Sequence, residues 1–508
     1  MTRIFAVVYG LKISNTPHLP HSGLLRPNYE QKFQEGKMHT RRDFIRDFAL
    51  LAGAAAVAPR VLAQSPKPKA SEPLRMAFIG VSGRGFSNYH DFIRRLKQKP
   101  VAFCDVNSNV WGLKEARKEF PDVPYFKDYR EMLEKMAGKI DAVAISTPDV
   151  SHYAASMCVA KRGIPFYLEK PMCHTIGQIR SLYKTVKDKK ITAQMGNQSH
   201  STEGIRFCAE WIKGGLIGKV REVVLWTDRP LGKGVAEFPN DVWKYPAEKP
   251  VPEYFDWDLW QNVAEPQPYF GDGVEYEKWR GWWKYGSGSL GDIGCHMLDI
   301  PVYSLGLPYP SRIKSTTRGV TPISVASQEK VEYFFDKSNQ GNPVKVTWYS
   351  GFKYPDKDGN YPENYDKSLL PPLPKEYTDT GRGYRELSDN GQFIIGEKGV
   401  IYSPAMHLGG RPALLPRDLW ESVKNDLPRT EERIKNGDHW LNFVEAVRGE
   451  AKLSSAFDYA HVLTEVVQLG NLASRTGADI VWDAKNLVCK GNKAATALVN
   501  PPMRKGWI

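Results

Sequence analysis

The feature that most constrains the fold is a mostly apolar strand pattern that runs directly into a glycine-rich turn. Residues 74–79 suit a buried strand, and a helical pattern follows from about Ser87 to Lys97. This order presents backbone N–H groups and the positive end of a helix to a phosphate group. Ser82 stands where the usual G-x-G-x-x-G pattern has its second glycine. The turn is predicted to bind a dinucleotide through Gly80, Ser82, Gly83, Arg84 and Gly85.

An acidic residue at the end of the second strand pattern favours NAD over NADP. The strand at residues 101–104 ends in Asp105, twenty residues after Gly85. A carboxylate at this position accepts hydrogen bonds from the hydroxyls of the adenosine ribose. It also repels a 2′-phosphate, and residues 106–107 supply no arginine to offset that repulsion. We therefore expect NAD as the cofactor, with NADP as the less favoured alternative.

Strand and helix patterns alternate through residues 74–197, as they do in a doubly wound parallel sheet. Further strands are expected at 142–146, 165–168 and 191–197, and helices at 109–119, 129–136 and 151–162. Parallel sheets bind ligands at the carboxyl ends of their strands. The candidate cofactor ligands at those ends are Thr147, Pro148, Glu169, Lys170 and Asn197. We predict an α/β protein whose first domain, residues 74–197, is an NAD-binding Rossmann domain.

Two later motifs connect this dinucleotide-binding pattern with one particular protein family. Glu169-Lys170-Pro171 follows one strand, and Asp292 and His296 form a D-x-x-x-H pattern much later in the chain. Behind a dinucleotide-binding turn, these motifs resemble the Gfo/Idh/MocA family, named after glucose-fructose oxidoreductase, inositol dehydrogenase and a rhizopine-catabolism protein. The resemblance covers nearly all of residues 74–508.

The resemblance implies a second domain and a catalytic group. Residues 198–508 would form an α+β domain with a large mixed, mostly antiparallel sheet. One face of that sheet carries the substrate, and the other often joins subunits into a homo-oligomer. The family pattern places catalysis on Lys170, Asp292 and His296. The loop-rich segment 353–389 is a candidate wall of the substrate pocket.

Elementary chemistry agrees with these roles. Asp292 and His296 are four residues apart, so they would share one face of an α-helix, where the carboxylate can orient the imidazole. His296 is then a candidate general base for a sugar hydroxyl while hydride leaves the same carbon. The ammonium of Lys170 can bridge the substrate hydroxyl and the cofactor, or carry the proton as a neutral amine. Asp292, His296 and Asp299 lack the spacing of a metal site, and no metal is expected.

Further candidate residues suit a sugar or glycoside substrate. Asn197 and His200 follow the last strand of the first domain, although a structural role for His200 is nearly as well supported. Trp279 and Arg280 lie in the tryptophan-rich stretch 243–283. An indole face and a guanidinium can stack on a pyranose ring and hydrogen-bond to it. Most tryptophans of this stretch are expected to pack the domain interface.

Residues 1–63 resemble a leader that contains a bacterial twin-arginine export signal. Arg41-Arg42 precede an apolar run at 48–58, which is too short to span a bilayer. Val61-Leu62-Ala63 is a small-residue cleavage site, and residues 64–73 form a linker pattern.

This leader predicts a periplasmic or otherwise exported protein. We expect translation to begin at Met38, recognition by the twin-arginine export machinery, cleavage near Ala63 and no stable membrane anchor. An uncleaved anchor is the alternative.

The charge distribution and the cysteines argue against a nucleic-acid-binding, zinc-binding or disulfide-stapled protein. The net charge is +13, of which +5 (nine Lys/Arg minus four Asp/Glu) lies in the first 63 residues. The remaining charge is spread along the chain, so nucleic acid is not an expected partner. The six cysteines include no C-x-x-C pair, which argues against a structural zinc site and a disulfide-stapled domain.

Export and a nicotinamide cofactor constrain each other. An exported enzyme that keeps its NAD must restore it within each catalytic cycle. Oxidation of one sugar coupled to reduction of another satisfies this, and we expect such a carbohydrate oxidoreductase. Transient oxidation of a sugar carbon that permits glycosidic cleavage is the alternative, a redox-neutral NAD-dependent hydrolase or lyase. A non-catalytic ligand-binding or assembly module is a third possibility.

Overall fold

The computed structural model describes residues 72–230, 237–274, 277–361, 365–404 and 412–508. The predicted leader, with its twin arginines, Met38 and the cleavage site, lies outside the described residues, as does nearly all of the linker.

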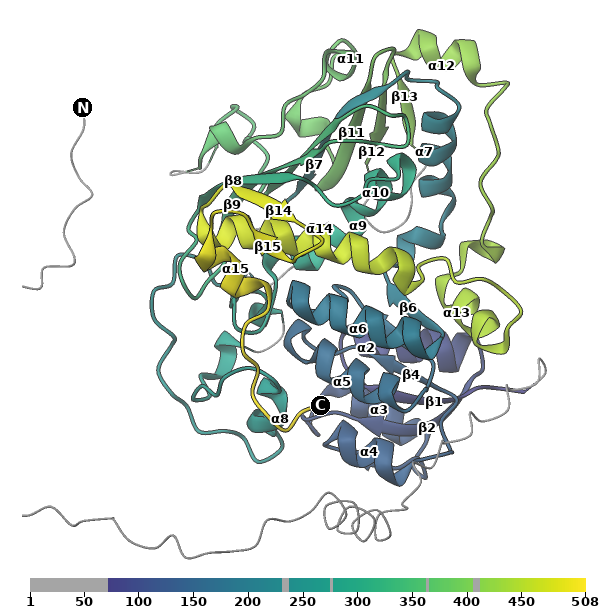
Figure 1. Ribbon diagram of the computed structural model, residues 1–508, viewed down its shortest axis with the longest axis vertical. Helices are drawn as coiled ribbons and strands as arrows, with labels where there is room; N and C mark the ends of the chain where they lie inside the picture. The colour runs from purple at the N-terminus through teal and green to yellow at the C-terminus, as the bar shows by residue number, and fades with distance from the viewer. Residues whose placement is uncertain (1–71, 231–236, 275–276, 362–364, 405–411) are drawn as a thin grey trace, which may run out of the picture. The chain divides into compact units, whose positions relative to one another are not determined.

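The first sheet has six parallel strands in the order β3-β2-β1-β4-β5-β6. The strands are β1 (Arg75–Ile79), β2 (Lys99–Cys104), β3 (Tyr125–Phe126), β4 (Ala142–Ile145), β5 (Phe166–Glu169) and β6 (Ala193–Gly196). Helices α2 (Arg84–Tyr89), α3 (Trp111–Glu119), α4 (Tyr129–Lys135), α5 (Asp149–Lys161) and α6 (Ile176–Lys189) connect them. The predicted doubly wound sheet is confirmed (Figure 1).

The first helix differs from its predicted form. Instead of one helix from about 87 to 97, α2 begins at Arg84 and continues as a π-helix over His90–Arg95. The helix therefore begins inside the glycine turn, closer to strand β1 than the apolar pattern indicated.

The second sheet has nine strands in the order β13-β12-β11-β7-β10-β9-β8-β14-β15. The strands are β7 (Val220–Thr227), β8 (Arg312–Arg318), β9 (Gln328–Phe335), β10 (Val344–Ser350), β11 (Asn390–Gly396), β12 (Val400–Ser403), β13 (Ala413–Leu415), β14 (Ile480–Asp483) and β15 (Val488–Cys489). Neighbours are antiparallel except β7 and β10, which are parallel. This confirms the predicted mixed, mostly antiparallel sheet.

Helices lie between the two sheets and join them into one core. They include α7 (Glu203–Lys213), α9 (Cys295–Met297), α10 (Asp299–Leu305), α13 (His439–Arg448) and α14 (Phe457–Thr476). The long helix α14 contacts α6 of the first domain and β8 and β9 of the second (Figure 1). Within the described residues, no helix combines the length and apolarity needed to cross a bilayer.

The loop-rich segment 353–389 packs on the sheet face that the helices leave free. Side chains alternate along β7, so Val223 and Leu225 join the core with the helices, whereas Val224 and Trp226 join a separate cluster. Tyr377 and Leu387 of the segment belong to that second cluster. The apolar side chains of its buried part therefore cover the sheet face opposite to the helices, which the sequence did not predict.

One glycine sets how closely α14 approaches the second sheet. A Cβ on Gly470 would lie 2.0 Å from the hydroxyl oxygen of Tyr333 and 2.8 Å from Cδ1 of Leu290. That hydroxyl is buried and has no hydrogen-bond partner among the described residues. Close packing therefore holds Leu290, which lies beside the predicted catalytic Asp292.

We predict that Gly470→Ala lowers the free energy of unfolding by about 1–3 kcal/mol through overpacking, despite the better helix propensity of alanine. Tyr333→Phe removes the clashing oxygen without breaking a hydrogen bond, so Gly470→Ala/Tyr333→Phe should recover much of the loss. Urea unfolding of the four proteins measures this coupling. An equal cost of Gly470→Ala in both backgrounds would contradict the packing explanation.

Candidate active site

The glycine turn allows a very close approach of backbone segments. Gly80 has φ +82°, and a Cβ there would lie 2.3 Å from the carbonyl oxygen of Ser146. A Cβ on Gly85 would lie 2.2 Å from the carbonyl oxygen of Gly80. Both glycines are therefore required sterically. At Ser82 the fold needs no glycine, since its carbonyl accepts the Gly85 amide at 2.8 Å in an ordinary turn.

Asp105 ties the glycine turn to the end of β2. Its carboxylate accepts hydrogen bonds from the amides of Val81 at 2.9 Å and Asn107 at 3.0 Å. Burial raises the pKa of Asp105, and these two amides oppose the rise. The carboxylate thus lies at the carboxyl edge of the sheet, beside the turn, as a ribose ligand must.

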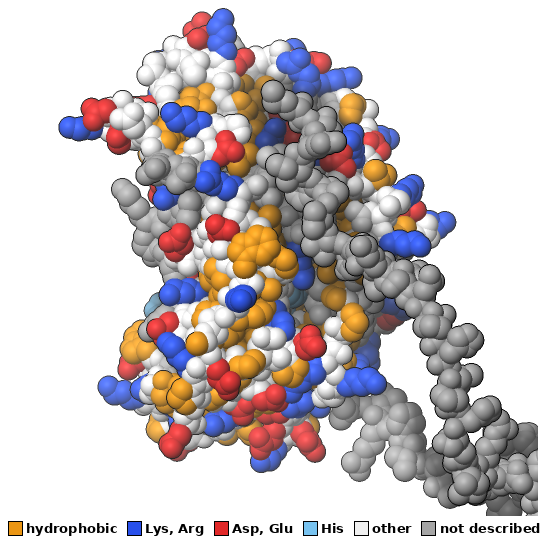
Figure 2. All heavy atoms as spheres, turned by 90° about the vertical axis from the view of Figure 1, so that its left-hand side faces the viewer, with side chains coloured by type: hydrophobic (Ala, Val, Ile, Leu, Met, Phe, Trp, Pro, Cys, Tyr) orange, Lys and Arg blue, Asp and Glu red, His pale blue; other side chains and the backbone are white. Residues whose placement is uncertain are grey.

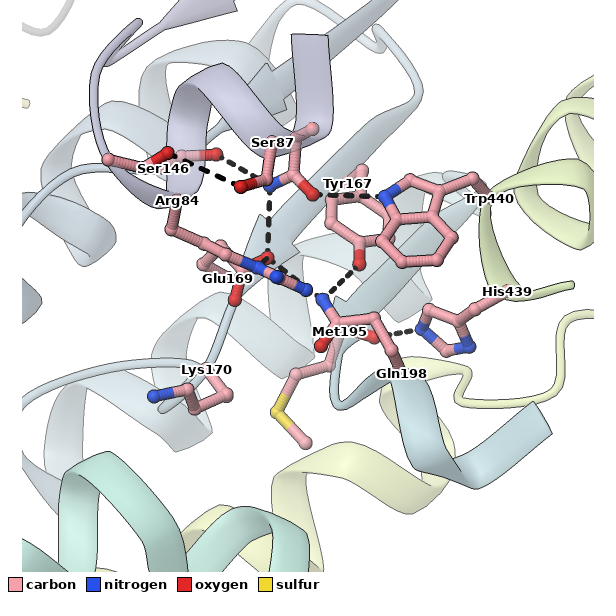
Figure 3. Close-up of polar contacts among 12 residues, drawn as sticks. Arg84, Ser87, Ser146, Tyr167, Glu169, Lys170, Met195, Gln198, His439 and Trp440 are labelled. Carbon is pink, nitrogen blue, oxygen red and sulfur yellow. Dashed lines mark hydrogen bonds and ion pairs between the residues drawn. The ribbon is translucent and has the colours of Figure 1, made fainter. Parts of the chain in front are cut away.

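Glu169 is the centre of a buried polar cluster (Figure 3). One carboxylate oxygen accepts from Arg84 at 3.1 Å, from Asn88 at 2.9 Å and from Gln198 at 2.9 Å. Burial by itself would raise the pKa of Glu169, but the positive charge of Arg84 and the hydrogen bonds outweigh it and lower the pKa. An ionised Glu169 therefore holds the glycine-turn helix, the end of β5 and the start of the second domain together. The indole of Trp440 donates to Asn88 at 2.9 Å and completes the cluster.

Lys170 points away from the Glu169 cluster (Figure 3) and reaches the second domain. Its ammonium donates to the backbone carbonyl of Asp292 at 2.7 Å and to the carboxylate of Asp292 at 3.2 Å. Both side chains are 12% exposed, so the pair is largely removed from water. The structure thus brings two of the three predicted catalytic residues into direct contact.

Two arginines share the carboxylate of Asp292 with Lys170. Arg280 donates to it at 2.9 Å, and the Nε of Arg229 lies 3.9 Å from its second oxygen. Burial by itself would raise the pKa of Asp292, but Arg280, Lys170 and Arg229 together hold it well below its usual range. Asp292 is therefore anionic at neutral pH. The guanidinium of Arg280 also lies 4.4 Å from the centroid of the Trp279 ring, which places both substrate candidates at this site.

The segment that carries Asp292 and His296 is not the regular α-helix that their spacing predicted. Residues Leu290–Gly294 form a π-helix, and His296 follows on the short helix α9. A π turn does not align residues four apart as an α turn does. His296 is nevertheless placed one turn after Asp292, with 2% of its surface exposed.

Asn197 and His200 meet at a second buried carboxylate, that of Asp299. Asn197 donates to one oxygen at 3.0 Å, and Nδ1 of His200 lies 2.8 Å from the other. The Tyr459 hydroxyl donates to that same oxygen at 2.5 Å. The imidazole is also enclosed by the rings of Tyr303 and Tyr459. His200 therefore has the contacts of a structural histidine.

Unpaired polar atoms along the carboxyl edge of the first sheet fit a bound dinucleotide. The Oγ1 of Thr147 follows β4, the Oε2 of Glu169 ends β5, and the Oδ1 of Asn197 follows β6. All three are buried and have no hydrogen-bond partner within the part of the chain that the structure describes. Buried polar groups are normally paired, so this row needs a ligand or water. Thr147 is held in place because His152 lies between its carbonyl and that of Pro171, at 2.8 and 2.7 Å.

Several site residues could not be found from the sequence. Asp299 extends the catalytic motif to D-x-x-x-H-x-x-D, a signal interpreted only as a weak metal ligand. Arg229, Tyr459 and Trp440 have no motif, and they reach the site only through the packing of distant segments. Within the described residues, no group of three or more His, Cys, Asp and Glu side chains is arranged to hold a metal ion.

A two-domain NAD-binding oxidoreductase is the class that this fold and site define. Residues 74–197 match the family model described as an oxidoreductase family NAD-binding Rossmann fold. Residues 242–346 and 387–508 match the C-terminal alpha/beta domain of the same oxidoreductase family. The chain belongs to the Gfo/Idh/MocA oxidoreductase family. The gap between the two C-terminal matches contains most of the loop-rich segment 353–389.

Curated relatives include sugar dehydrogenases and glycosidases. The levoglucosan dehydrogenase of Pseudarthrobacter phenanthrenivorans is 23% identical over 41% of this chain and 43% of its own length. The glycosyl hydrolase family 109 protein 2 of Akkermansia muciniphila is 26% identical over 35% and 45%. The D-glucoside 3-dehydrogenase of Escherichia coli is 26% identical over 47% and 56%. The chain thus matches only about half the length of these relatives.

Solved structures share the fold. The WlbA dehydrogenase of Bordetella pertussis, solved with NADH and UDP-GlcNAcA, aligns with a TM-score of 0.54 at 15% identity, over 81% of this chain and 99% of its own. The aldose-aldose oxidoreductase of Caulobacter crescentus aligns with a TM-score of 0.50 at 14% identity, over 81% and 100%. At this identity the likeness describes the fold alone.

A buried histidine beneath the site predicts loss of stability in mild acid. His439 lies 2.8 Å from the Met195 carbonyl and 2.7 Å from the Ser201 hydroxyl, and burial lowers its pKa to about 4. The unfolded chain binds this proton near the ordinary pKa of 6.5. Between these values the unfolded state binds more protons, so stability is full above pH 6.5 and falls as the pH drops toward 4.

We therefore expect His439→Gln to lose less stability between pH 7.5 and pH 5 than the parent protein, although it is less stable at pH 7.5. Urea unfolding at both pH values measures the difference. His90→Gln, at an exposed histidine, should retain the parent's dependence on pH. Identical pH dependence in all three proteins would contradict the assignment.

Proposed function

We propose that the protein oxidises and reduces sugar hydroxyl groups with an NAD that stays bound throughout the catalytic cycle. The observation that carries the proposal is the buried contact of Lys170 with Asp292. Lys170 follows β5, and β5 lies between β4 and β6, which Thr147 and Asn197 follow with their unpaired oxygens. This order supports a role for the ammonium at the edge where the nicotinamide end of a dinucleotide would lie.

The residues divide the chemistry of such a step between them. Bound NAD would supply the hydride acceptor. The anionic Asp292 holds the ammonium of Lys170, which can donate a hydrogen bond to the substrate oxygen and stabilise negative charge that develops there. His296 is the candidate base that takes the hydroxyl proton. Arg280 and Trp279 supply a donor and an aromatic face for the sugar ring.

Asp105 supports NAD rather than NADP. Its carboxylate already accepts two backbone amides, which fix its position beside the glycine turn. A 2′-phosphate would meet this fixed negative charge, whereas ribose hydroxyls would donate to it.

A redox-neutral glycosidase or lyase is the second candidate. Relatives named glycosyl hydrolase family 109 protein and alpha-N-acetylgalactosaminidase favour it, since they match this chain as well as the dehydrogenases do. The same residues would serve, because transient oxidation of one sugar carbon precedes cleavage and hydride then returns. A purely ligand-binding module is less well supported, because it would not need the buried Lys170 and Asp292 pair.

Export and self-association belong to the proposal as well. The twin-arginine pattern at Arg41-Arg42 supports export of the folded protein with its cofactor to the periplasm. Family resemblance supports a homo-oligomer. The retained cofactor follows from export, since a released NAD would not be replaced outside the cytoplasm.

Nucleotide content tests the retained cofactor. We expect the full chain, purified without added nucleotide and then denatured, to release NAD or NADH in a roughly 1:1 ratio. Asp105→Ala should release much less, because the ribose loses its acceptor. The nucleotide is identified by chromatography and mass spectrometry. Release of NADP, or of no nucleotide, would overturn the proposed cofactor.

Substitution of Lys170 tests both catalytic candidates. Lys170→Ala should lower turnover by about 10²–10⁴-fold, while Lys161→Ala, at an exposed lysine on α5, should leave it unchanged. A panel of sugars and glycosides is assayed for released sugar and for absorbance of NADH. Released sugar without net redox change would favour the glycosidase. Unchanged turnover in Lys170→Ala would contradict both candidates.

A further inference from the structure

A second cavity lies apart from the Lys170 and Asp292 site. Its volume is about 400 Å³, and it lies between the start of α6, the end of α14, the loop at 283–287 and the C-terminal tail. Lys170, Asp292 and Arg280 are absent from its described lining. Ligand pockets commonly begin at about this volume. On the side of the molecule shown in Figure 2, hydrophobic side chains gather with Lys and Arg side chains among them.

The C-terminal tail forms one wall of this cavity through residues 501–503. Several contacts fix the tail in place. Gly177 lets Asn500 pack directly on α6, since a Cβ there would lie 2.3 Å from the Asn500 side-chain oxygen. Arg504 forms an ion pair with Asp258 at 2.7 Å, and Arg130 donates to the Gly506 carbonyl at 2.9 Å. These contacts fix the tail as one wall of the cavity.

Two cations of the lining lack carboxylate partners. Neither Lys284 nor Arg475 forms an ion pair with an acid among the residues that the structure describes. Lys284 donates only to the backbone carbonyl of Glu265 at 3.2 Å, and burial lowers its pKa although the charge of Glu265 opposes this. Arg475 is exposed at the rim, 5.8 Å from the centroid of the Trp283 ring. With Glu265 as the one acid of the described lining, the cavity keeps a positive charge.

One residue of the lining, Gln178, also carries an unpaired acceptor. Gln178 is 4% exposed, and its side-chain oxygen has no hydrogen-bond partner in the described chain. Nearby polar groups are already paired, since Gln468 donates to the Ser287 hydroxyl at 3.1 Å and accepts from Asn471 at 3.0 Å. The free oxygen calls for a donor such as a ligand hydroxyl.

Aromatic side chains complete the lining. Trp283 and Tyr245 both face the cavity, and each lies beside one of the two cations. Aromatic faces suit the apolar faces of sugar rings. A ligand that satisfies all the groups has a carboxylate for the cations, hydroxyls for Gln178 and a ring for the aromatic side chains.

We propose that this cavity is a second binding site, for a monosaccharide-sized sugar acid of the uronate type. It is separate from the catalytic pocket and goes beyond the proposed function. The carboxylate lies between Lys284 and Arg475, and a ring hydroxyl donates to the side-chain oxygen of Gln178.

Calorimetric titration of the full chain tests the site, with D-glucuronate as the probe. We expect binding of glucuronate and about tenfold to hundredfold weaker binding in Arg475→Gln and Lys284→Gln, because each loses a charge-assisted hydrogen bond. Lys170→Ala should bind glucuronate as the parent does, which separates this site from the catalytic pocket. Arg417→Gln, at an exposed arginine on helix α12 (Arg417–Val423) away from the cavity, is the matched control.

The remaining outcomes overturn the inference. Equal binding of D-glucose removes the need for the cations, and equal binding of inorganic sulfate shows a simple anion site. If titration with glucuronate at about 10 mM gives no heat of binding, the cavity is not the proposed sugar-acid site. Loss of binding in Lys170→Ala with retention in Arg475→Gln assigns the probe to the catalytic pocket. Because turnover is not measured here, failure of this inference is distinguishable from failure of the proposed function.

Discussion

The contact of Lys170 with Asp292 joins the two domains at the point where chemistry is expected. Lys170 directly follows a strand of the parallel sheet, and Asp292 comes from the π-helix of the second domain. Removing two charges from water is costly unless each finds partners. Asp292 has three cationic neighbours, and Lys170 also has a backbone carbonyl. The same contact therefore joins the two domains and keeps the Asp292 carboxylate ionised.

A similar arrangement recurs at two other buried carboxylates of the junction. Glu169 joins the glycine-turn helix to the first residues of the second domain through Arg84, Asn88 and Gln198. Asp299 joins the end of β6 to helix α14 through Asn197 and Tyr459. Each carboxylate accepts hydrogen bonds from distant segments, so these polar contacts specify how the segments dock beside the hydrophobic core. The unpaired atoms left beside these clusters are the ones that a dinucleotide would use.

The second cavity lies next to the loop before the π-helix that carries Asp292. Both sites lie against the loop that leads into the π-helix, since the Ser287 carbonyl accepts the amide of Gly291 at 2.9 Å. The π-helix after this loop carries Asp292, whereas the loop itself lines a basic, aromatic cavity that the tail closes on one side. The C-terminal tail has no sequence motif, but it forms one wall of the cavity.

Local patterns in the sequence determined the first sheet, the glycine turn, the position of Asp105 at the end of β2 and the family membership. These depend on short-range periodicity and on glycines whose need is steric, at Gly80 and Gly85. Only the tertiary structure decided that the segment 353–389 covers the far face of the sheet and that His200 is enclosed by tyrosines. It also brought Arg229 and Trp440 into the site, and it converted the expected helix at Asp292 into a π turn. The physical reason is that burial, charge pairing and packing between distant segments depend on three-dimensional neighbours, which no local pattern specifies.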